Sequence, residues 1–447
     1  AVSLQQFSVD PRPLDKNVPA NFLQKLIFNK FMYNKQEFYE KQLQQLGLME
    51  KDAFTCTCYM DEVGNKPKQG DILSWSESSA VVYVNSVLGA RCNRNSGIMD
   101  LMGAIVGFVP YFGLLTDEGR KASWIVRVET TKKPEAQLLG SAIGMKVMED
   151  VPYIVGLDQW LGTDLNESAR TYLKDFGAAT ASNGAVGLYH VENLTPEAKE
   201  QKEALIQKDA KVYVINDAEL ERVKRSYQIV WKHPNVKPKL CFVGCPHMSL
   251  QQLKDWTDKI EARLKKYGNE KVLIPTVFTA APGVLKEFEQ TPYAERLRAT
   301  GVITYYICPL MYMNNPLCAK IPVVTPGTVK AEAVVTHTGF HTLASLQKAL
   351  QFGDKTAKCN DQNNPELFGK PLAGCALCLP QTIGSTTGGM VLYCACAMKR
   401  QPACMLFANP IDSLAAAGAI LAEVWLDDVK MPVVDSLGEE FLEYVKG

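Results

Sequence analysis

Three cysteines in the sequence have positions that suit metal binding. Cys245 and Cys308 each follow the carboxyl end of an expected strand, and Cys56 likewise follows a short strand expected at the start of 53–60. In an open parallel sheet, ligand sites form outside the carboxyl ends of the strands. Cys245 also precedes an expected helix, whose N-terminal dipole favours a thiolate. Three thiolates at one edge would hold a metal centre with an open position, but such long spacings suit three structural cysteines at least as well.

Two closely spaced cysteine pairs compete for the same role. They are the CxxC of Cys375 and Cys378 and the CxC of Cys394 and Cys396. The CxxC lies in an apolar segment expected to be a strand, where residues three apart point to opposite faces. Free cysteine behaves as a small hydrophobic residue. We therefore expect both pairs to be buried rather than to bind metal.

A glycine-rich loop, GSTTGG at 384–389, lies between an expected strand and an expected helix. Backbone N–H groups at such a junction can bind an anion. The loop lacks the Gly-Lys-Ser/Thr ending of a nucleotide-binding loop, so a carboxylate or one phosphate is the expected ligand. The predicted contacts are Gly384, Ser385, Thr386 and Thr387. A tight turn with capping hydroxyls explains the same residues equally well.

A second polar region surrounds the turn GARCNRN. Its candidate ligands for a substrate are Glu77, Ser78, Asn85, Arg91, Asn93 and Arg94. Arginine binds a carboxylate through two parallel hydrogen bonds, and asparagine adds oriented dipoles. Glu77 adjoins an apolar segment and suits a base, a ligand partner or a helix cap. Charged residues in turns are usually only solvated, so this turn by itself only suggests an anion site.

Two runs of alternating strands and helices must position these residues. Residues 239–310 read as strand, helix, strand, helix and strand, with one helix expected over 283–301. Residues 364–447 repeat this alternation around the glycine-rich loop. Such runs predict parallel strands with right-handed crossovers. Further upstream, Asp217 is expected to cap a helix over 217–227.

Composition excludes some classes of partner. Lys+Arg and Asp+Glu both number 48 in 447 residues, so no basic field exists for nucleic acid or an anionic membrane. The longest apolar stretch, 98–115, is interrupted by Asp100, glycines and a proline, which argues against a membrane span. Thirteen cysteines without a signal-peptide pattern favour reduced thiols in the cytoplasm or an organelle matrix. A small molecule is the expected partner.

Several long motifs resemble the aconitase X family. They are WSESSAVVYVNSVLGARCNR (75–94), GCPHMSLQQL (244–253), the 301–309 segment, LAGCALCLPQTIGSTTGGMVLY and NPIDSLAAAGAILAEVW. The resemblance covers most of the chain. It implies an α/β fold, with an aconitase-like multi-domain catalytic region of parallel sheets over residues 1–353. A smaller α/β swivelling domain is expected over 354–447, apparently without its first strands.

The resemblance also implies a chemistry. The family's three ligand cysteines match Cys56, Cys245 and Cys308, which would hold a [2Fe-2S] cluster, a [4Fe-4S] cluster or a single iron. Its serine base matches Ser385. Members dehydrate cis-3-hydroxy-L-proline or mevalonate 5-phosphate, and the fused domains are similar to the hydroxyproline type. In this interpretation Arg91 and Arg94 anchor the substrate carboxylate, and His247 orients a thiolate or protonates the leaving hydroxide.

The chain also departs from the family pattern. Members usually begin with a further helical segment that carries an Ala-His motif, and the first swivelling-domain strands are not recognised between Gly353 and Asn364. A lysine of the family pattern matches Lys330 only with a displacement of one position. Either a second chain or a removed segment is expected to supply these parts, or the chain is a diverged, non-catalytic binding protein.

Overall fold

All sheets in the described part of the chain are parallel. The structure, a computed structural model, describes residues 6–12, 26, 34–49, 53–95, 97–227, 236–238, 240–307, 329–426 and 429–445. Two sheets have four strands, one has three, and two are strand pairs. This arrangement confirms the predicted α/β class. Among the described helices, none combines the length and the apolar character that a membrane span requires.

The first part of the chain builds short elements around one buried helix. They are α2 (Gln36–Leu46), β1 (Ile72–Leu73), α3 (Ser78–Tyr83), the π-helical turn η2 (Val84–Leu88), β2 (Arg91–Cys92) and α4 (Gly97–Val106). Residues 53–58 form no ladder strand, and Phe54 makes only an isolated bridge to Val9. The expected strand before Cys56 is therefore a loop, because it has no neighbouring strand to pair with.

The next sheet has the strand order β5-β4-β3-β6. Its strands are β3 (Ala122–Val128), β4 (Pro152–Val155), β5 (His190–Val191) and β6 (Ile206–Ile215). Its helices are α5 (Ala136–Val147), α6 (Asp158–Leu161), α7 (Glu167–Asn183), α8 (Pro196–Gln201) and α9 (Asp217–Ser226). The cap of α9 is Asn216, whose side chain accepts from the N–H of Glu219. The predicted cap, Asp217, is instead the first helical residue.

The three-stranded sheet contains β7 (Cys241–Met248), β8 (Thr276–Ala280) and β9 (Val302–Tyr305). The helix α10 (Leu250–Tyr267) follows β7 as predicted and begins with a capping box of Ser249 and Gln252. The single helix expected over 283–301 is two helices, α11 (Pro282–Glu289) and α12 (Pro292–Ala299). Pro292 cannot donate an intrahelical bond, so it starts a new helix.

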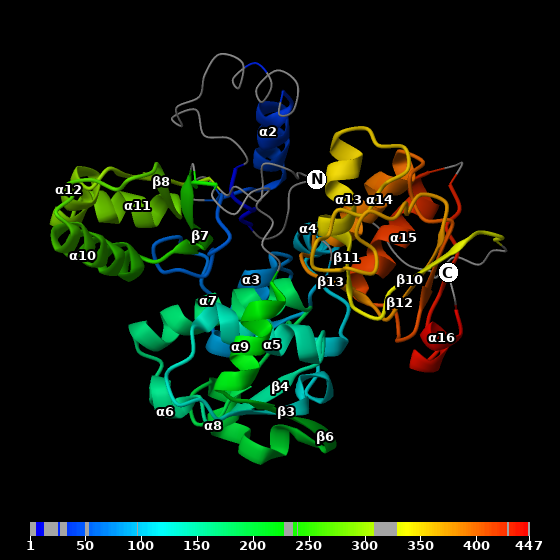
Figure 1. Ribbon diagram of the computed structural model, residues 1–447, viewed down its shortest axis with the longest axis horizontal. Helices are drawn as coiled ribbons and strands as arrows, with labels where there is room; N and C mark the ends of the chain where they lie inside the picture. Colours follow the sequence, from blue (N-terminus) through cyan, green and yellow to red (C-terminus); the bar gives the residue numbers. More distant parts are fainter. Residues whose placement is uncertain are drawn as a thin grey trace.

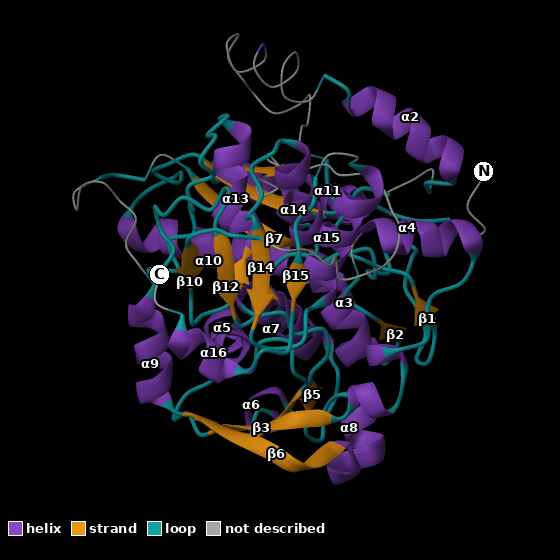
Figure 2. Cartoon of the chain, turned by 90° about the vertical axis from the view of Figure 1, so that its right-hand side faces the viewer, coloured by secondary structure: helices purple, strands orange, loops and turns teal. Residues whose placement is uncertain are grey.

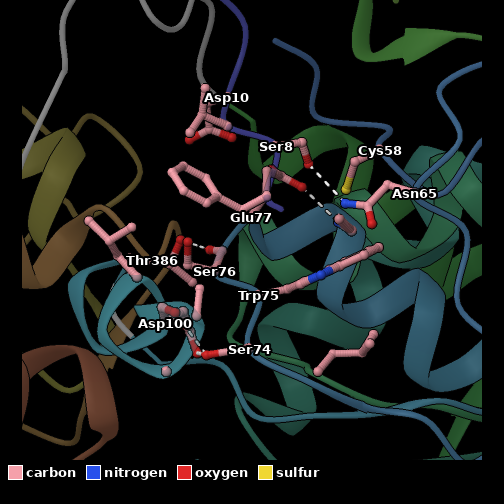
Figure 3. Close-up of a pocket in the computed structure, with 18 of the residues that line it drawn as sticks. Ser8, Asp10, Cys58, Asn65, Ser74, Trp75, Ser76, Glu77, Asp100 and Thr386 are labelled. Atoms are coloured by element: carbon pink, nitrogen blue, oxygen red, sulfur yellow. Dashed lines mark hydrogen bonds between the residues drawn. The ribbon is translucent and has the colours of Figure 1, made fainter. Parts of the chain in front are cut away.

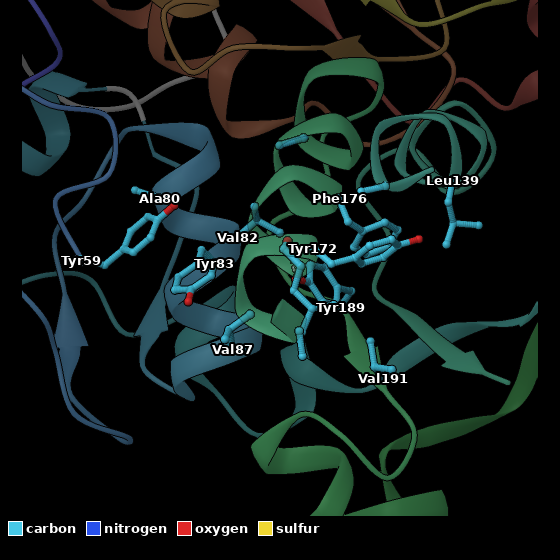
Figure 4. Packing of buried hydrophobic residues seen from close by; sticks show 14 of the residues in the cluster. Tyr59, Ala80, Val82, Tyr83, Val87, Leu139, Tyr172, Phe176, Tyr189 and Val191 are labelled. Carbon is cyan, nitrogen blue, oxygen red and sulfur yellow. Dashed lines mark hydrogen bonds between the residues drawn. The ribbon is translucent and has the colours of Figure 1, made fainter. Parts of the chain in front are cut away.

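One hydrophobic core joins these parts. It runs from Cys58 to Val302 and includes side chains from α3, α5, α7, β3 and β8. Figure 4 shows its aromatic centre, where the rings of Tyr59 and Tyr83 stack at 4.0 Å. Phe176 meets Tyr189 edge-on at 4.9 Å. Segments from residue 58 to residue 302 thus contribute to one main core, and a smaller separate cluster lies around Tyr153.

A second large core belongs to the C-terminal unit, whose sheet has the order β10-β12-β14-β15 (Figure 2). Its strands are β10 (Ala333–Val335), β12 (Ala376–Leu379), β14 (Cys404–Phe407) and β15 (Val433–Val434), beside the pair β11 (Phe340–His341) and β13 (Thr382–Ile383). Its helices are α13 (Thr342–Gln351), α14 (Gly388–Ala397), α15 (Ser413–Trp425) and α16 (Glu439–Tyr444).

This unit begins earlier than the predicted boundary between residues 353 and 354. The ladder pairs Ala333 with Ala376, so β10 is part of the C-terminal sheet. Phe340 and Leu346 pack in the C-terminal core. Strands that the sequence analysis did not recognise therefore lie before residue 353. They are short, which is why periodicity did not reveal them.

Candidate active site between the two units

A cavity of about 750 Å³ lies where the C-terminal unit meets the rest of the chain. One wall consists of Thr386, Thr387 and Met390 from the glycine-rich loop and α14. The facing walls come from residues 6–12, from 71–77 and from α4. Figure 3 shows Thr386 next to Ser76 at this contact. The cavity therefore has polar groups from segments about 300 residues apart in sequence.

The glycine-rich loop contributes its threonines to the cavity wall. Ser385 is half-buried and directly precedes them, and its Oγ lies 3.1 Å from Oγ1 of Thr387. Ser385 itself is not among the described residues that line the cavity. Gly384 has φ +96°, and a Cβ there would lie 2.3 Å from Nε2 of His341. Glycine is required at this turn by both its backbone angle and its space.

Backbone amides of this loop are largely used within the protein. The N–H of Gly384 donates to the carbonyl of Gly184 at 2.8 Å. The N–H of Thr387 donates to Oγ of Ser385, and that of Gly388 donates to the carbonyl of Ser385. The predicted anion pocket is therefore reduced to the amides of Ser385 and Thr386. The tight-turn alternative explains the loop better.

The two arginines of the GARCNRN turn bind protein groups. Arg91 donates to the carbonyl of Leu115 and pairs with Asp117. Arg94 donates to the carbonyls of Ala185 and Gly384, both at 2.5 Å. Neither is among the described cavity-lining residues. Their predicted role as carboxylate anchors is thus not supported, because both arginines lie outside the cavity lining and donate to protein groups. The buried Nε of Arg94 has no hydrogen-bond partner among the described residues.

The predicted asparagines also serve the fold. Asn85 is buried, and its side chain bonds the backbone of Cys92, the carbonyl of Gly187 and Arg120. Asn93 bonds the carbonyl of Phe112 and the N–H of Leu114. Both amide groups have the partners that buried polar atoms require, so neither is available to a substrate. The buried ion pair of Arg120 and Glu197, at 2.7 Å, completes this network and was not predicted.

Glu77 lies in the cavity wall and caps a helix. Its carboxylate accepts from the N–H of Ala80 and from Oγ of Ser79, both at 2.6 Å. The capping alternative for Glu77 is therefore confirmed. Ser78 lies in the first turn of α3 and is half-buried, outside the described cavity lining.

Asp100 is a cavity residue that the sequence analysis did not propose. Its Oδ1 accepts from Oγ of Ser74 at 3.1 Å, whereas its buried Oδ2 has no hydrogen-bond partner in the described part of the chain. Burial raises the pKa of Asp100 to about 8, against the hydrogen bonds from Asn95 and Ser74. The signal was visible in the sequence, since Asp100 is the one acidic residue within the apolar segment 97–109.

Two of the three proposed ligand cysteines lie close in the fold. The backbone N–H of His247 donates to Sγ of Cys56 at 3.3 Å, and His247 follows Cys245 by two residues. Cys56 is buried and Cys245 is exposed. Cys308 lies outside the described residues. The backbone of Ile307, its neighbour in sequence, acts on the pKa of His247 and therefore lies close to that ring.

His247 is a neutral, fully buried residue. Its Nδ1 lies 2.9 Å from Oγ1 of Thr55. Burial lowers the pKa of His247 to about 3, and the charge of Lys174 acts in the same direction. A histidine that is uncharged at neutral pH is a poor proton donor. Its predicted role in protonating a leaving hydroxide is therefore not supported, whereas its backbone contact with Cys56 fits the orienting role.

Lys174 anchors the part of β7 that carries Cys245. It is buried, donates to the carbonyl of His247 at 3.1 Å, and pairs with Asp175 at 2.8 Å. Asp175 in turn accepts from Gln252 in the first turn of α10. The helix α7 thus bonds this segment at His247 and the following helix α10 at Gln252. The sequence offered no signal for this, because Lys174 looks like any polar residue of an amphipathic helix.

The donor set fits an iron centre as far as it is described. The thiol of Cys56 accepts from the backbone two residues after Cys245, and thiolates are preferred ligands of iron clusters. Within the described ranges, no group of three His, Cys, Asp or Glu side chains is arranged to hold a metal. The competing pairs behave largely as predicted: Cys375, Cys378 and Cys396 are buried, whereas Cys394 is exposed. Burial raises the pKa of Cys375 and Cys396 to about 12, which opposes ligation.

Models of one protein family match three segments. They are the aconitase X first domain at residues 11–118, the second domain at 122–225 and the swivel domain at 319–447. The swivel match includes the strands that the structure places before residue 353.

Curated relatives carry two names. The large subunit of phosphomevalonate dehydratase from Thermococcus kodakarensis is 37% identical over 265 residues, which cover 58% of this chain and 63% of that protein. Cis-3-hydroxy-L-proline dehydratase from Hypocrea jecorina is 30% identical over 256 residues, covering 56% of this chain and 40% of that protein. Each match therefore spans less than two thirds of the relative.

A solved structure shares the fold. The holo form of aconitase X from Thermococcus kodakaraensis matches with a TM-score of 0.57 and 31% identity, and the match covers 70% of this chain and 72% of that one. The parallel sheets, the C-terminal swivel unit and these matches lead to one conclusion: the chain belongs to the aconitase X family.

Proposed function

We propose that this chain is a hydro-lyase that removes water from a small β-hydroxy acid. The cavity at the contact between the glycine-rich loop and residues 74–77 carries the proposal. A site that two units share can enclose its substrate and exclude water when they close. The relatives are named as dehydratases, and the chain spans 40–63% of the two described above.

The charges of the cavity favour cis-3-hydroxy-L-proline as the substrate. Its wall holds the carboxyl groups of Asp10, Asp71, Glu77 and Asp100. Arg12 is the only cationic side chain among the described lining residues, and it pairs with Glu40. A zwitterionic amino acid places an ammonium group beside carboxylates, whereas a phosphate ester would add about two negative charges. Burial raises the pKa of Asp10 to about 6, as expected where no cation compensates.

We assign Cys56, Cys245 and Cys308 as the residues that would hold an iron centre. When bound, an iron with an open position supplies a Lewis acid for the leaving hydroxyl. The chain's own groups then bind and orient the substrate: Thr386 and Thr387 offer hydroxyls, and Glu77 offers a carboxylate. Ser385 is the proposed base for the proton next to the substrate carboxylate, with Thr387 as its hydrogen-bond neighbour at 3.1 Å.

Mevalonate 5-phosphate is the second candidate substrate. Higher identity to the relatives of that name favours it, at 37% and 36% for two archaeal large subunits. Those names also make a second chain a candidate partner. A diverged, non-catalytic ligand-binding protein is the candidate of another class. The two dehydratase proposals differ in the substrate that is turned over, and the binding protein differs from both in having no turnover.

The test is an anaerobic purification followed by iron, sulfide and turnover assays. Cys245→Ser is compared with Cys375→Ser, a buried cysteine in the other unit. We expect iron in the parent and in Cys375→Ser, loss of iron in Cys245→Ser, and turnover of cis-3-hydroxy-L-proline only. Turnover of mevalonate 5-phosphate alone would replace the substrate. Iron without any turnover would favour the binding protein, and absence of iron would overturn the metal assignment. A co-purifying chain would identify the partner.

A further inference from the structure

We infer that Arg94 is a positioning residue that clamps the glycine-rich loop of the swivel unit against the catalytic region. This role differs from the carboxylate anchor that its residue type first suggested. The clamp sets the position of the wall formed by Thr386 and Thr387 and of the adjacent Ser385. Its importance for turnover rests on the proposed function, but the clamp itself does not.

The guanidinium of Arg94 joins two units through backbone carbonyls. Its Nη1 donates to Ala185, directly after the turn that ends α7, and its Nη2 donates to Gly384 in the swivel unit. The carbonyl of Arg94 also accepts from Oγ of Ser413, the first residue of α15, at 2.6 Å. One residue thus contacts both the loop and a helix start of the other unit.

Two further bonds close the same contact. The N–H of Gly384 donates to the carbonyl of Gly184 at 2.8 Å, and the carbonyl of Gly384 accepts from Arg94. Both backbone groups of Gly384 therefore bond the catalytic region. Oγ1 of Thr386 donates to the carbonyl of Ser76 (Figure 3). A swivel movement that opens the cavity must break these bonds together with those of Arg94.

The environment of Arg94 suits a clamp rather than a substrate ligand. The residue as a whole is only 8% exposed. Burial lowers the pKa of Arg94 to about 10, while Asp412 and Glu149 act in the opposite direction, so the group remains charged at neutral pH. A buried cation needs its acceptors, and a planar guanidinium reaches two carbonyls at once in a way that an ammonium does not. Opening the contact would therefore expose a charged group and release both carbonyls.

Arg91 provides a matched comparison in the same turn. It too donates to a carbonyl, that of Leu115, but its acceptors all lie between residues 115 and 117. Its side chain is 23% exposed. Loss of Arg91 therefore removes an arginine from the turn without touching the contact between the units.

The experiment measures hydrogen–deuterium exchange in the full chain without substrate, for Arg94→Ala, Arg94→Lys and Arg91→Ala. In Arg94→Ala we expect at least tenfold faster exchange in peptides covering 383–390 and 183–188, with β3 and β14 unchanged. Arg94→Lys should fall between Arg94→Ala and the parent, and Arg91→Ala should match the parent. Unchanged exchange in Arg94→Ala, or equal acceleration in Arg91→Ala, would overturn the clamp.

Steady-state kinetics separate the clamp from a substrate anchor. A clamp predicts a lower kcat in Arg94→Ala with partial recovery in Arg94→Lys, alongside the exchange effect. An anchor predicts a raised KM without altered exchange, which would contradict the clamp. If no variant and no parent turns over either substrate, the proposed function fails while the exchange result still decides the clamp. Should Arg94→Ala not fold, Thr386→Val removes another bond of the contact and must accelerate the same peptides.

Discussion

Two segments at the ends of strands carry most of the proposed chemistry, and they are held in different ways. The segment 244–249, at the carboxyl end of β7, is bonded within its own part of the chain: His247 bonds Thr55 and, through its carbonyl, Lys174, and Gly244 bonds Thr279. The loop at 384–387 is bonded across units, to Gly184, Arg94 and Ser76. Figure 1 shows β7 and β13 in these two separate parts of the molecule.

The difference separates a fixed side of the site from a docked side. The 244–249 segment contributes Met248 to the core that runs from Cys58 to Val302, so a movement of this segment would disturb that core. The glycine-rich loop belongs to a unit with its own core, so it can leave the site as a body. A metal centre needs fixed ligands, whereas a base and a cavity wall can tolerate docking. The predictions below test this division.

The largest expected effect is on the docked side. Ser385→Ala should lower kcat about 1,000-fold, about 4 kcal/mol in activation free energy, because it removes the proposed base. Ser413→Ala, which removes one bond of the interdomain contact, should cost less than about tenfold. Kinetics with cis-3-hydroxy-L-proline check this. Normal turnover in Ser385→Ala would remove the base assignment.

The pH dependence of stability should reveal Asp100. Its pKa in the folded chain is about 8, above the unfolded value of about 3.9, so the folded state binds its proton more tightly. At low pH Asp100 is protonated in both states and its burial costs little. The free energy of unfolding then falls as the pH rises toward 8, because the unfolded chain releases this proton more readily. Between pH 5 and pH 8 this loss is up to about 4 kcal/mol in the free energy of unfolding.

Urea unfolding at pH 5 and pH 8 measures that loss, which Asp100→Asn should abolish. Asp117→Asn is the control: the pKa of Asp117 lies below its usual range because of Arg91, so this variant should keep the parental loss. A parental loss that persists in Asp100→Asn would mean that Asp100 is ionised in the folded state.

On the fixed side, Gly244→Ala should lower the free energy of unfolding by about 3 kcal/mol. Gly244 has φ +129°, and a Cβ would lie 2.3 Å from Oγ1 of Thr279 and 2.5 Å from its carbonyl oxygen. Gly268→Ala is the control, because Gly268 also has a positive φ, +67°, but a Cβ there would meet no atom within 4 Å. This variant should lower the free energy of unfolding by about 1 kcal/mol. Equal losses of unfolding free energy in the two variants, measured by urea unfolding, would show that the 244–249 segment adjusts to the added methyl group at little cost.

The smallest expected effect is that of Lys174→Met. It removes the bond to the carbonyl of His247 and leaves Asp175 without its buried cation, at a cost of about 2 kcal/mol. Lys199→Met is the surface control, since Lys199 bonds the carbonyl of Thr163 while largely exposed, and should cost less than about 0.5 kcal/mol. Thermal unfolding compares the two. A loss no larger than the control would mean that α7 does not anchor the 244–249 segment.

Local signals in the sequence determined much of the fold. The alternation of strands and helices over 239–310 predicted α10, and the alternation over 364–447 predicted the parallel strands β12, β14 and β15. These features depend on residues within a few positions of one another. The short strand β10 escaped detection because three residues carry too little periodicity.

The site divides in the same way. Residue types and family motifs led from the sequence to Cys56, Cys245 and the glycine-rich loop. Only the tertiary structure decided what the polar groups bind: Asn85 and Asn93 hold backbone, and Arg94 reaches a carbonyl 290 positions away. The type of a side chain determines which groups it can form hydrogen bonds with. Its partner depends on which distant backbone the packing brings within about 3 Å, and no local pattern encodes that.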